Sequence, residues 1–227
     1  MRPAPRTKKG RETRQRILAA AEQMFSTNGY SDASVARITD AAGVGQGTFY
    51  LYFDSKLELF EQLVEDLNRR VRRAMSEASA AAPNRIEAER AGFRAFFQFT
   101  AEHPSLYRIV REAELVSPGA LRLHYGRIVD GYIEGLRQAG AAGEIGDIDP
   151  TVAAWALMGI GEMIGMRWVL WSNGEAGDDS DPLASGTSAV PDEVFEQMMT
   201  FIGRALGRPE PAATPSPPTP LSEGQPQ

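Results

Sequence analysis

The sequence contains, at positions 43–53, the segment Gly43-Val44-Gly45-Gln46-Gly47-Thr48-Phe49-Tyr50-Leu51-Tyr52-Phe53. Phe49 and Phe53 are four residues apart, so on a helix both side chains lie on one face and are expected to point into a core. Other side chains of this helix then point outward, namely those of Gln46, Thr48, Tyr50 and Leu51. The segment therefore predicts a short helix with a buried aromatic face and an exposed face.

A second short helix is expected immediately before this segment. Ser34 is a favourable N-cap, Val35 and Ile38 follow helical spacing, and Gly43 ends the helix. A glycine between two short helices allows the sharp angle of a helix-turn-helix. Such pairs are also common as simple packing units in all-α proteins, so this geometry alone leaves both interpretations open.

The rest of the chain also has helical periodicity. A first helix is predicted at about 11–26, where Asn28-Gly29 provides a stop. Ser55-Lys56-Leu57-Glu58 has the pattern of a capping box that opens a long helix, and Pro83 follows the end of that helix. Prolines and glycines delimit five further helices, at about 84–102, 105–115, 118–139, 150–171 and 191–206. The sequence predicts an all-α protein of nine helices, with unstructured segments at 172–190 and 208–227.

The charge of the chain is unevenly distributed. The formal net charge of the 227 residues is -6, which by itself argues against a nucleic-acid partner. Residues 1–53, however, hold eight Lys or Arg and four Asp or Glu. Seven of these basic residues fall within the first sixteen positions, where Glu12 is the only acidic residue. We therefore expect a local phosphate-binding arm within an acidic protein, which favours DNA binding by the helix-turn-helix.

Composition also limits the cellular setting. The absence of cysteine excludes disulfides and cysteine-ligated metals. The first residues lack the apolar run of a secretion signal, so we expect a cytoplasmic protein. Residues 152–171 are mostly apolar, but Glu162 and Arg167 would be costly in a bilayer. We expect this segment to be a buried helix of a large core, and we expect no membrane partner.

The sequence contains no recognisable catalytic motif. The glycines at 43, 45 and 47 do not follow a strand and lack the spacing of a nucleotide-binding loop. His103 and His124 have no neighbours with metal-ligand spacing. No nucleophile elbow, zinc-binding helix or P-loop is present, so we expect no enzyme, no cofactor and no metal site.

Residues 14–60 resemble the TetR family of regulators, above all in the segment 43–53 followed by Ser55-Lys56. The order of nine helices extends the resemblance to about residue 206. The resemblance implies a homodimeric, ligand-responsive repressor whose third helix enters the major groove of a DNA operator. With it we expect four regions: a basic flexible arm (1–10), a helix-turn-helix domain (11–54), a ligand-binding and dimerisation domain (55–207) and a disordered proline-rich tail (208–227).

The resemblance also assigns roles to individual positions of the DNA-binding domain. It implies base contacts at Gln46, Gly47, Tyr50 and Leu51. It implies phosphate contacts at Ser34, Thr48, Tyr52 and Lys56, and Arg14 and Arg37 complete the predicted DNA-binding set.

The chain departs from the family pattern at two places. Gly45-Gln46 stands where many members have Ser-Lys, which removes a cation, and Ala36 is too small to contact a base. DNA affinity is therefore expected to depend more on the basic arm.

The helices predicted between 84 and 171 contain more large, adaptable apolar side chains than a short core needs. We expect there a pocket for an elongated apolar ligand, with an anionic head group held by arginines on neighbouring helices. The predicted ligand-binding residues are Phe93, Phe96, Phe97, Tyr107, Arg108, Arg111, Trp155, Met158 and Met163, and Arg122 and Arg127 are further candidates for the head group.

The ligand itself is less closely defined. Residues 107–114 and 155–171 loosely resemble the TetR-family repressors of fatty-acid degradation, which respond to acyl-coenzyme A. This resemblance implies a long-chain acyl-CoA effector. A regulator of drug efflux that senses aromatic or cationic compounds remains an alternative, as does an architectural DNA-binding protein without a ligand.

Glycines at 159, 161 and 165 allow another helix to approach closely, either from the same chain or from a partner subunit. The resemblance implies that the last two helices pair with their copies in a four-helix bundle, and their apolar surfaces look too extensive for one chain to cover. The predicted dimer interface comprises Gly161, Gly165, Trp168, Phe195, Met199 and Ile202.

Overall fold

The computed structural model describes residues 5, 7–171 and 190–207. Within these residues the protein consists of nine α-helices and one π-helical segment, and no strand is present. The elements are α1 (Lys8–Asp32), α2 (Val35–Ala41), α3 (Gln46–Phe49), α4 (Lys56–Ser79), α5 (Arg85–Glu102), α6 (Ser105–Val116), α7 (Pro118–Ala142), α8 (Pro150–Gly165), η1 (Met166–Leu170) and α9 (Asp192–Leu206). The all-α fold class is confirmed. The segments predicted to be unstructured, apart from Val190, lie outside the described residues.

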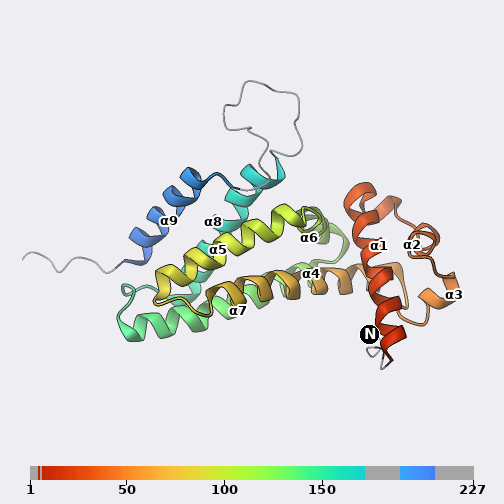
Figure 1. The fold of residues 1–227 in the computed structure, drawn as a ribbon, viewed down its shortest axis with the longest axis horizontal. Helices are drawn as coiled ribbons and strands as arrows, with labels where there is room; N and C mark the ends of the chain where they lie inside the picture. The colour runs from red at the N-terminus through yellow and green to blue at the C-terminus, as the bar shows by residue number, and fades with distance from the viewer. Residues whose placement is uncertain (1–4, 6, 172–189, 208–227) are drawn as a thin grey trace, which may run out of the picture.

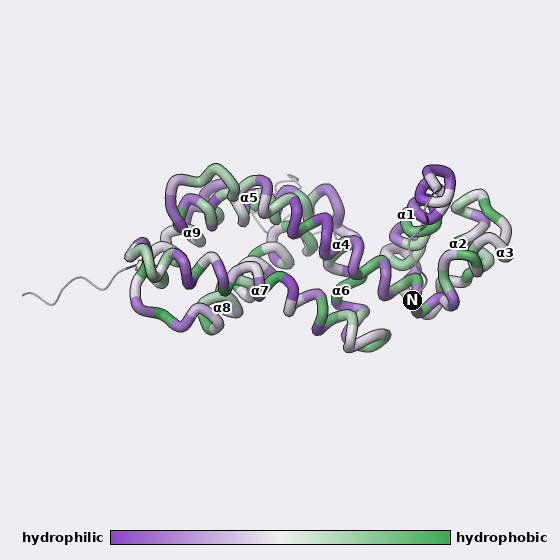
Figure 2. Tube along the Cα trace, turned by 90° about the horizontal axis from the view of Figure 1, so that it is seen from below, coloured by the Kyte–Doolittle hydropathy of each residue, from purple (hydrophilic) through white to green (hydrophobic). Residues whose placement is uncertain are grey.

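The molecule is elongated, with α1, α2 and α3 at one end and a helical bundle at the other (Figure 1). The long helix α4 runs from the α1–α3 unit along the bundle and packs against α5 and α7. Helix α6 contacts α1, so it forms a second link between the two ends. Figure 2 shows hydrophilic and hydrophobic residues alternating along α4 and α7, as expected for helices with one face in a core.

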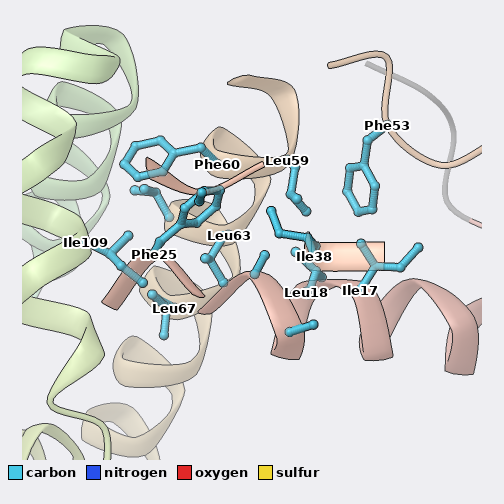
Figure 3. Packing of buried hydrophobic residues seen from close by; sticks show 14 of the residues in the cluster. Ile17, Leu18, Phe25, Ile38, Phe53, Leu59, Phe60, Leu63, Leu67 and Ile109 are labelled. Carbon is cyan, nitrogen blue, oxygen red and sulfur yellow. The ribbon is translucent and has the colours of Figure 1, made fainter. Parts of the chain in front are cut away.

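A first hydrophobic core joins the two ends of the molecule (Figure 3). Phe25 of α1 and Phe60 of α4 pack edge to face, with ring centroids 5.5 Å apart. Ile38 of α2, Phe53 and Ile109 of α6 are completely buried in the same cluster. Burial of a side chain of this size contributes ~1.5–3 kcal/mol. The division expected at residue 54 therefore falls within one continuous core.

A second hydrophobic core fills the far part of the bundle and includes residues of α5, α7, α8 and α9. The rings of Phe97 in α5 and Phe195 in α9 meet edge to face at 6.3 Å. Two ion pairs between the same helices flank this contact, Arg90 with Glu196 at 2.6 Å and Arg94 with Asp192 at 3.1 Å. Helix α9 is thus packed against its own chain.

The ends of two elements differ from the sequence prediction. Helix α1 begins at Lys8, not near residue 11, because the Thr7 side chain accepts a hydrogen bond from the Gly10 N–H and caps it. Gly29 has the expected positive φ, 78°, but the chain returns to helix up to Asp32. The helix predicted at 150–171 is regular only to Gly165 and continues as the π-helical η1.

Candidate functional site

Helices α2 and α3 form the predicted helix-turn-helix. The Ser34 side chain accepts a hydrogen bond from the Arg37 N–H at 3.2 Å and caps α2. Gly43 has a φ of 63°, a left-handed conformation that costs glycine little. The Val44 N–H donates to the carbonyl of Thr39 at 3.0 Å, which closes the turn before α3.

Helix α3 has one buried and one exposed face, as the spacing predicted. Phe49, and Phe53 just beyond the helix, are completely buried. On the opposite face the side chains of Tyr50 and Leu51 are 47% and 67% exposed. The exposed residues are Gln46, Gly47, Tyr50 and Leu51, and Thr48 and Tyr52 are partly buried beside them. Amide, phenol and aliphatic groups that project from α3 and from the residues just after it can contact base edges in a DNA groove.

Basic side chains on α1 lie close to this unit. A Cβ built on Gly10 would lie 3.6 Å from the Tyr52 hydroxyl, which places the first turns of α1 beside the end of α3. Arg16 reaches the turn, since its Nη1 would lie 3.8 Å from a Cβ at Gly43. Lys8 and Lys9, expected in a flexible arm, belong instead to the first turn of α1 and are exposed. Arg2 and Arg6 lie outside the described residues.

Lys56, predicted to contact phosphate, has several partners within the protein. Its Nζ donates to the carbonyl oxygens of Tyr30 at 2.7 Å and Ala33 at 2.8 Å, and it lies 4.2 Å from the centroid of the Tyr30 ring. Because the ammonium group is engaged by these carbonyls, it stabilises the end of α1.

Arg14 is likewise engaged within the protein. Its guanidinium donates to the Gln62 side chain of α4 and lies 5.5 Å from the centroid of the Phe53 ring. Partial burial lowers the pKa of Arg14. Arg14 therefore attaches α1 to α4, whereas the sequence predicted a DNA contact.

Polar contacts that the sequence did not reveal connect the α1–α3 unit to the bundle. Glu22 of α1 accepts hydrogen bonds from the Ser105 hydroxyl at 2.5 Å and from Arg70 at 3.1 Å. The Tyr30 N–H donates to Glu112 of α6 at 2.6 Å. The partners are 48 to 83 residues apart in sequence, so no local pattern indicates them.

The bundle encloses an apolar cavity between α4, α5, α6, α7 and α8, with a volume of about 50 Å³. This space holds a few water molecules and is well below the volume of an ordinary ligand pocket. Four residues predicted to bind ligand line it: Phe93, Phe96, Tyr107 and Met158. Its wall also includes Met75, Leu106, Val110, His124, Tyr125, Ile128, Tyr132, Gly161 and Glu162, none of which was predicted to bind ligand.

The other residues predicted for this pocket lie elsewhere. Trp155 and Met163 are 50% and 55% exposed on the outer side of α8. Phe97 belongs to the second core. Arg108 donates to the Ser26 carbonyl of α1 at 3.1 Å, and Nη1 of Arg111 lies 3.9 Å from the sulfur of Met166. Arg108 and Arg111 therefore do not form the expected binding site for an anionic head group.

Two polar residues of the cavity wall, Tyr125 and His124, have polar partners, whereas the buried Tyr107 hydroxyl has none among the described residues. The Tyr125 hydroxyl donates to Glu162 at 2.8 Å, and burial together with this bond raises the pKa of Tyr125. The Asn68 amide donates to the His124 carbonyl at 2.9 Å and lies 3.2 Å from its Nδ1. Burial lowers the pKa of His124 to about 4, so its ring is neutral at pH 7.

The glycines assigned to a dimer interface pack inside the chain. A Cβ on Gly161 would lie 2.8 Å from the Phe93 ring, and a Cβ on Gly165 would overlap the Tyr107 hydroxyl. Phe195, Met199 and Ile202 are buried in the second core, and Trp168 is half-buried beside Arg167. These residues therefore have contacts within the chain itself, and their assignment to a dimer interface stays a prediction.

A different face of α8 and α9 remains uncovered. Val152, Trp155 and Met163 project from α8, and Phe201 projects from α9, each at least half exposed. Gly159, on the same side of α8, has no atom within 4 Å of a built Cβ. This outer face, defined by these five residues, is apolar and unpartnered in the single chain.

No helix among the described residues is long and apolar enough to span a membrane. The same residues contain no group of three His, Cys, Asp or Glu side chains that could hold a metal ion.

Comparison with known proteins identifies the N-terminal unit. The family model "Bacterial regulatory proteins, tetR family" matches residues 17–63. The uncharacterized HTH-type transcriptional regulator YdgC of Bacillus subtilis is 48% identical over 65 residues, 29% of this chain and 33% of YdgC. The HTH-type transcriptional activator FasR of Mycolicibacterium smegmatis is 34% identical over 125 residues, 51% of this chain and 55% of FasR. The chain thus spans a third to about half the length of these curated relatives.

Solved structures extend the similarity of fold to the bundle. The fatty acid degradation regulator FadR from Bacillus halodurans superposes with a TM-score of 0.69 at 19% identity, covering 84% of this chain and 94% of FadR. Salmonella enterica GusR superposes with a TM-score of 0.70 at 22% identity, covering 88% of this chain and 98% of GusR. Residues 17–63 thus match the TetR family of bacterial regulatory proteins in sequence, and the described body of the chain shares the fold of these solved structures.

Proposed function

We propose that the protein is a ligand-responsive transcriptional regulator, acting as a repressor, that binds a palindromic DNA operator as a homodimer. The observation that carries this proposal is the outward face of α3 and of the residues just after it, where Gln46, Tyr50 and Leu51 are exposed and two phenylalanines are buried on the other side. Phosphate contacts would come from Ser34, Arg37, Thr48 and Tyr52 and from the basic residues of α1.

The homodimer is proposed to form through the outer face of α8 and α9. One α3 reaches only a few base pairs, and two copies related by a two-fold axis would reach two half-sites about one helical turn apart. Trp155 and Phe201 are large apolar side chains of the kind that anchor protein interfaces. This proposal differs from the interface predicted from the sequence, whose residues Gly161, Gly165, Phe195, Met199 and Ile202 are buried within the chain.

The effector is proposed to bind in the apolar cavity. Phe93, Phe96 and Met158 provide planar and flexible walls that suit an elongated apolar chain, such as that of a long-chain acyl-CoA. Because the cavity has a volume of only about 50 Å³, ligand entry requires its walls to separate. Ligand binding would favour this opened state. If the two copies of α3 are positioned differently in the opened state, ligand binding would release DNA.

A second class of effector is favoured by one observation. Glu162 places a carboxylate in the cavity wall, next to the Tyr125 hydroxyl. A partly buried carboxylate attracts a cation, so aromatic or cationic compounds of the kind handled by drug efflux are the alternative ligands.

The experiment that tests the DNA-binding proposal starts by selecting bound sequences from random duplex DNA with the full chain. We expect an inverted repeat, and we expect Tyr50→Ala to weaken specific binding by ~1–3 kcal/mol. Leu115→Ala, which truncates an exposed side chain of α6, is the matched control and should bind normally. Unchanged operator affinity in a folded Tyr50→Ala variant would contradict the assignment of α3.

A further inference from the structure

A second cavity adjoins the apolar one. It has a volume of about 190 Å³ and lies between α4, α5 and α7. Met75, Ile128 and Tyr132 line both cavities, so these three side chains lie between the two spaces. We call this second space the arginine vestibule, because Arg72 and Arg85 line it; its other lining residues include Ser76, Ser79, Glu89, Gly92 and Gly131.

The vestibule carries a net positive charge. Arg85 is 15% exposed and forms an ion pair with Glu89, whose side chain is 2% exposed. The Arg85 Nε is buried and has no hydrogen-bond partner among the described residues. Arg72 is exposed at the opening and has no ion pair among those residues. Two guanidinium groups thus face one carboxylate, whereas the apolar cavity contains the carboxylate of Glu162 and no guanidinium.

Two glycines of α7 provide the space for this arrangement. A Cβ at Gly135 would overlap Nη1 of Arg85, so this position holds the guanidinium only because it has no side chain. A Cβ at Gly131 would meet no atom within 4 Å, so the space beside it is open. Guanidinium groups bind carboxylate and phosphate through paired N–H donors.

We infer that the arginine vestibule holds the anionic head group of an amphiphile whose apolar chain occupies the adjoining apolar cavity. The inference rests on the proposed function, since it concerns the same effector. Met75, Ile128 and Tyr132 form the boundary that the chain must cross, and Met75 is unbranched and adaptable. Arg72 and Arg85 take the role that the sequence analysis gave to Arg108, Arg111, Arg122 and Arg127.

Three twelve-carbon probes test the head-group preference on the full chain by isothermal titration calorimetry: dodecanoate, dodecanol and dodecylamine. Dodecanoate is expected to bind most tightly. Arg72→Ala should weaken dodecanoate binding about tenfold and leave dodecanol binding unchanged. Arg73→Ala, the neighbouring exposed arginine paired with Glu77, is the matched control and should change neither.

A second pair of variants tests the space without removing a charge. Gly131→Val fills the vestibule and should weaken dodecanoate binding, whereas Gly126→Val, on the same helix but outside both cavities, should not.

Equal binding of dodecanoate and dodecanol, or no effect of Arg72→Ala and Gly131→Val on dodecanoate binding, would overturn the vestibule assignment and leave the proposed apolar site in place. Preferred binding of dodecylamine would overturn it in favour of Glu162. Absence of binding by all three probes would overturn the effector site itself, with operator binding still to be judged separately through Tyr50→Ala.

Discussion

The ammonium group of Lys56 at the start of α4 caps the carbonyl oxygens of Tyr30 and Ala33 at the end of α1. Lys56→Met removes this donor, and the two carbonyl oxygens lose a hydrogen bond. The free energy of unfolding should therefore fall by ~1–3 kcal/mol. Urea denaturation measures this change.

The same variant separates a structural lysine from a phosphate contact. The salt dependence of operator affinity should be unchanged in Lys56→Met, because no phosphate contact is lost. Arg37→Ala serves as the comparison, since Arg37 is exposed beside the Ser34 cap and should lose about 0.9 from the salt slope. A reduced slope in Lys56→Met would restore its assignment as a DNA contact.

Gly165→Ala should be strongly destabilising. The new Cβ would overlap the Tyr107 hydroxyl, and overpacking of this kind costs ~1–3 kcal/mol. Adding Tyr107→Phe removes the overlapping oxygen and should recover part of the loss. Thermal unfolding of the single and double variants measures both effects, and a Gly165→Ala protein of normal stability but altered oligomeric state would instead place Gly165 at a subunit interface.

The outer face of α8 and α9 should control the oligomeric state. Trp155→Glu and Phe201→Glu place charges on this face and should each weaken dimerisation by ~2 kcal/mol or more. Sedimentation velocity over a range of protein concentrations measures the dimer fraction. Leu115→Glu alters an exposed apolar residue of α6, away from this face, and should leave the dimer intact. A persistent dimer in both face variants would rule out this surface.

Acidification should destabilise the protein through His124. Burial lowers the pKa of His124 from 6.5 in the unfolded chain to about 4 in the folded one, so the unfolded chain binds the extra proton between these values. Stability from this residue is therefore present above pH 6.5 and is lost as the pH falls towards 4, by about 3 kcal/mol in total. His124→Leu should flatten this part of the stability profile, since Asn68 keeps its bond to the backbone carbonyl. If the substitution leaves the profile unchanged, groups other than His124 cause the loss of stability at low pH.

Local patterns predicted most of the fold. Ser34, Ser55 and Pro118 mark helix starts through capping or a fixed φ, and the four-residue spacing of Phe49 and Phe53 defines the buried side of α3. The residues that form each of these signals lie within one or two helical turns of each other, so a short stretch of sequence is enough to recognise them.

Contacts between distant helices were not predictable in the same way. A glycine stripe indicates close approach but does not identify the approaching helix, and Gly161 and Gly165 meet α5 and α6 of their own chain. The family resemblance implied a phosphate contact at Lys56, but it gave no sign of the bond from this side chain to a carbonyl 26 residues away. Arg85 lies at a helix start near no ligand motif, and its position against Gly135 appears only once α5 and α7 are packed.

Because the first core is continuous, a tilt of α4 would move α1 to α3 together with it. Met75 of α4 lines the apolar cavity, and Lys56, ~28 Å away along the same helix, holds α1. A tilt of ~5° about the cavity end would displace the Lys56 end by ~2.5 Å. Because Phe25 and Ile38 are buried in one cluster with Phe60 and Leu63, α1 to α3 would travel with that end as a rigid body. If a ligand binds in the cavity as proposed, small changes in cavity width would thus be amplified along the helix before they reach α3.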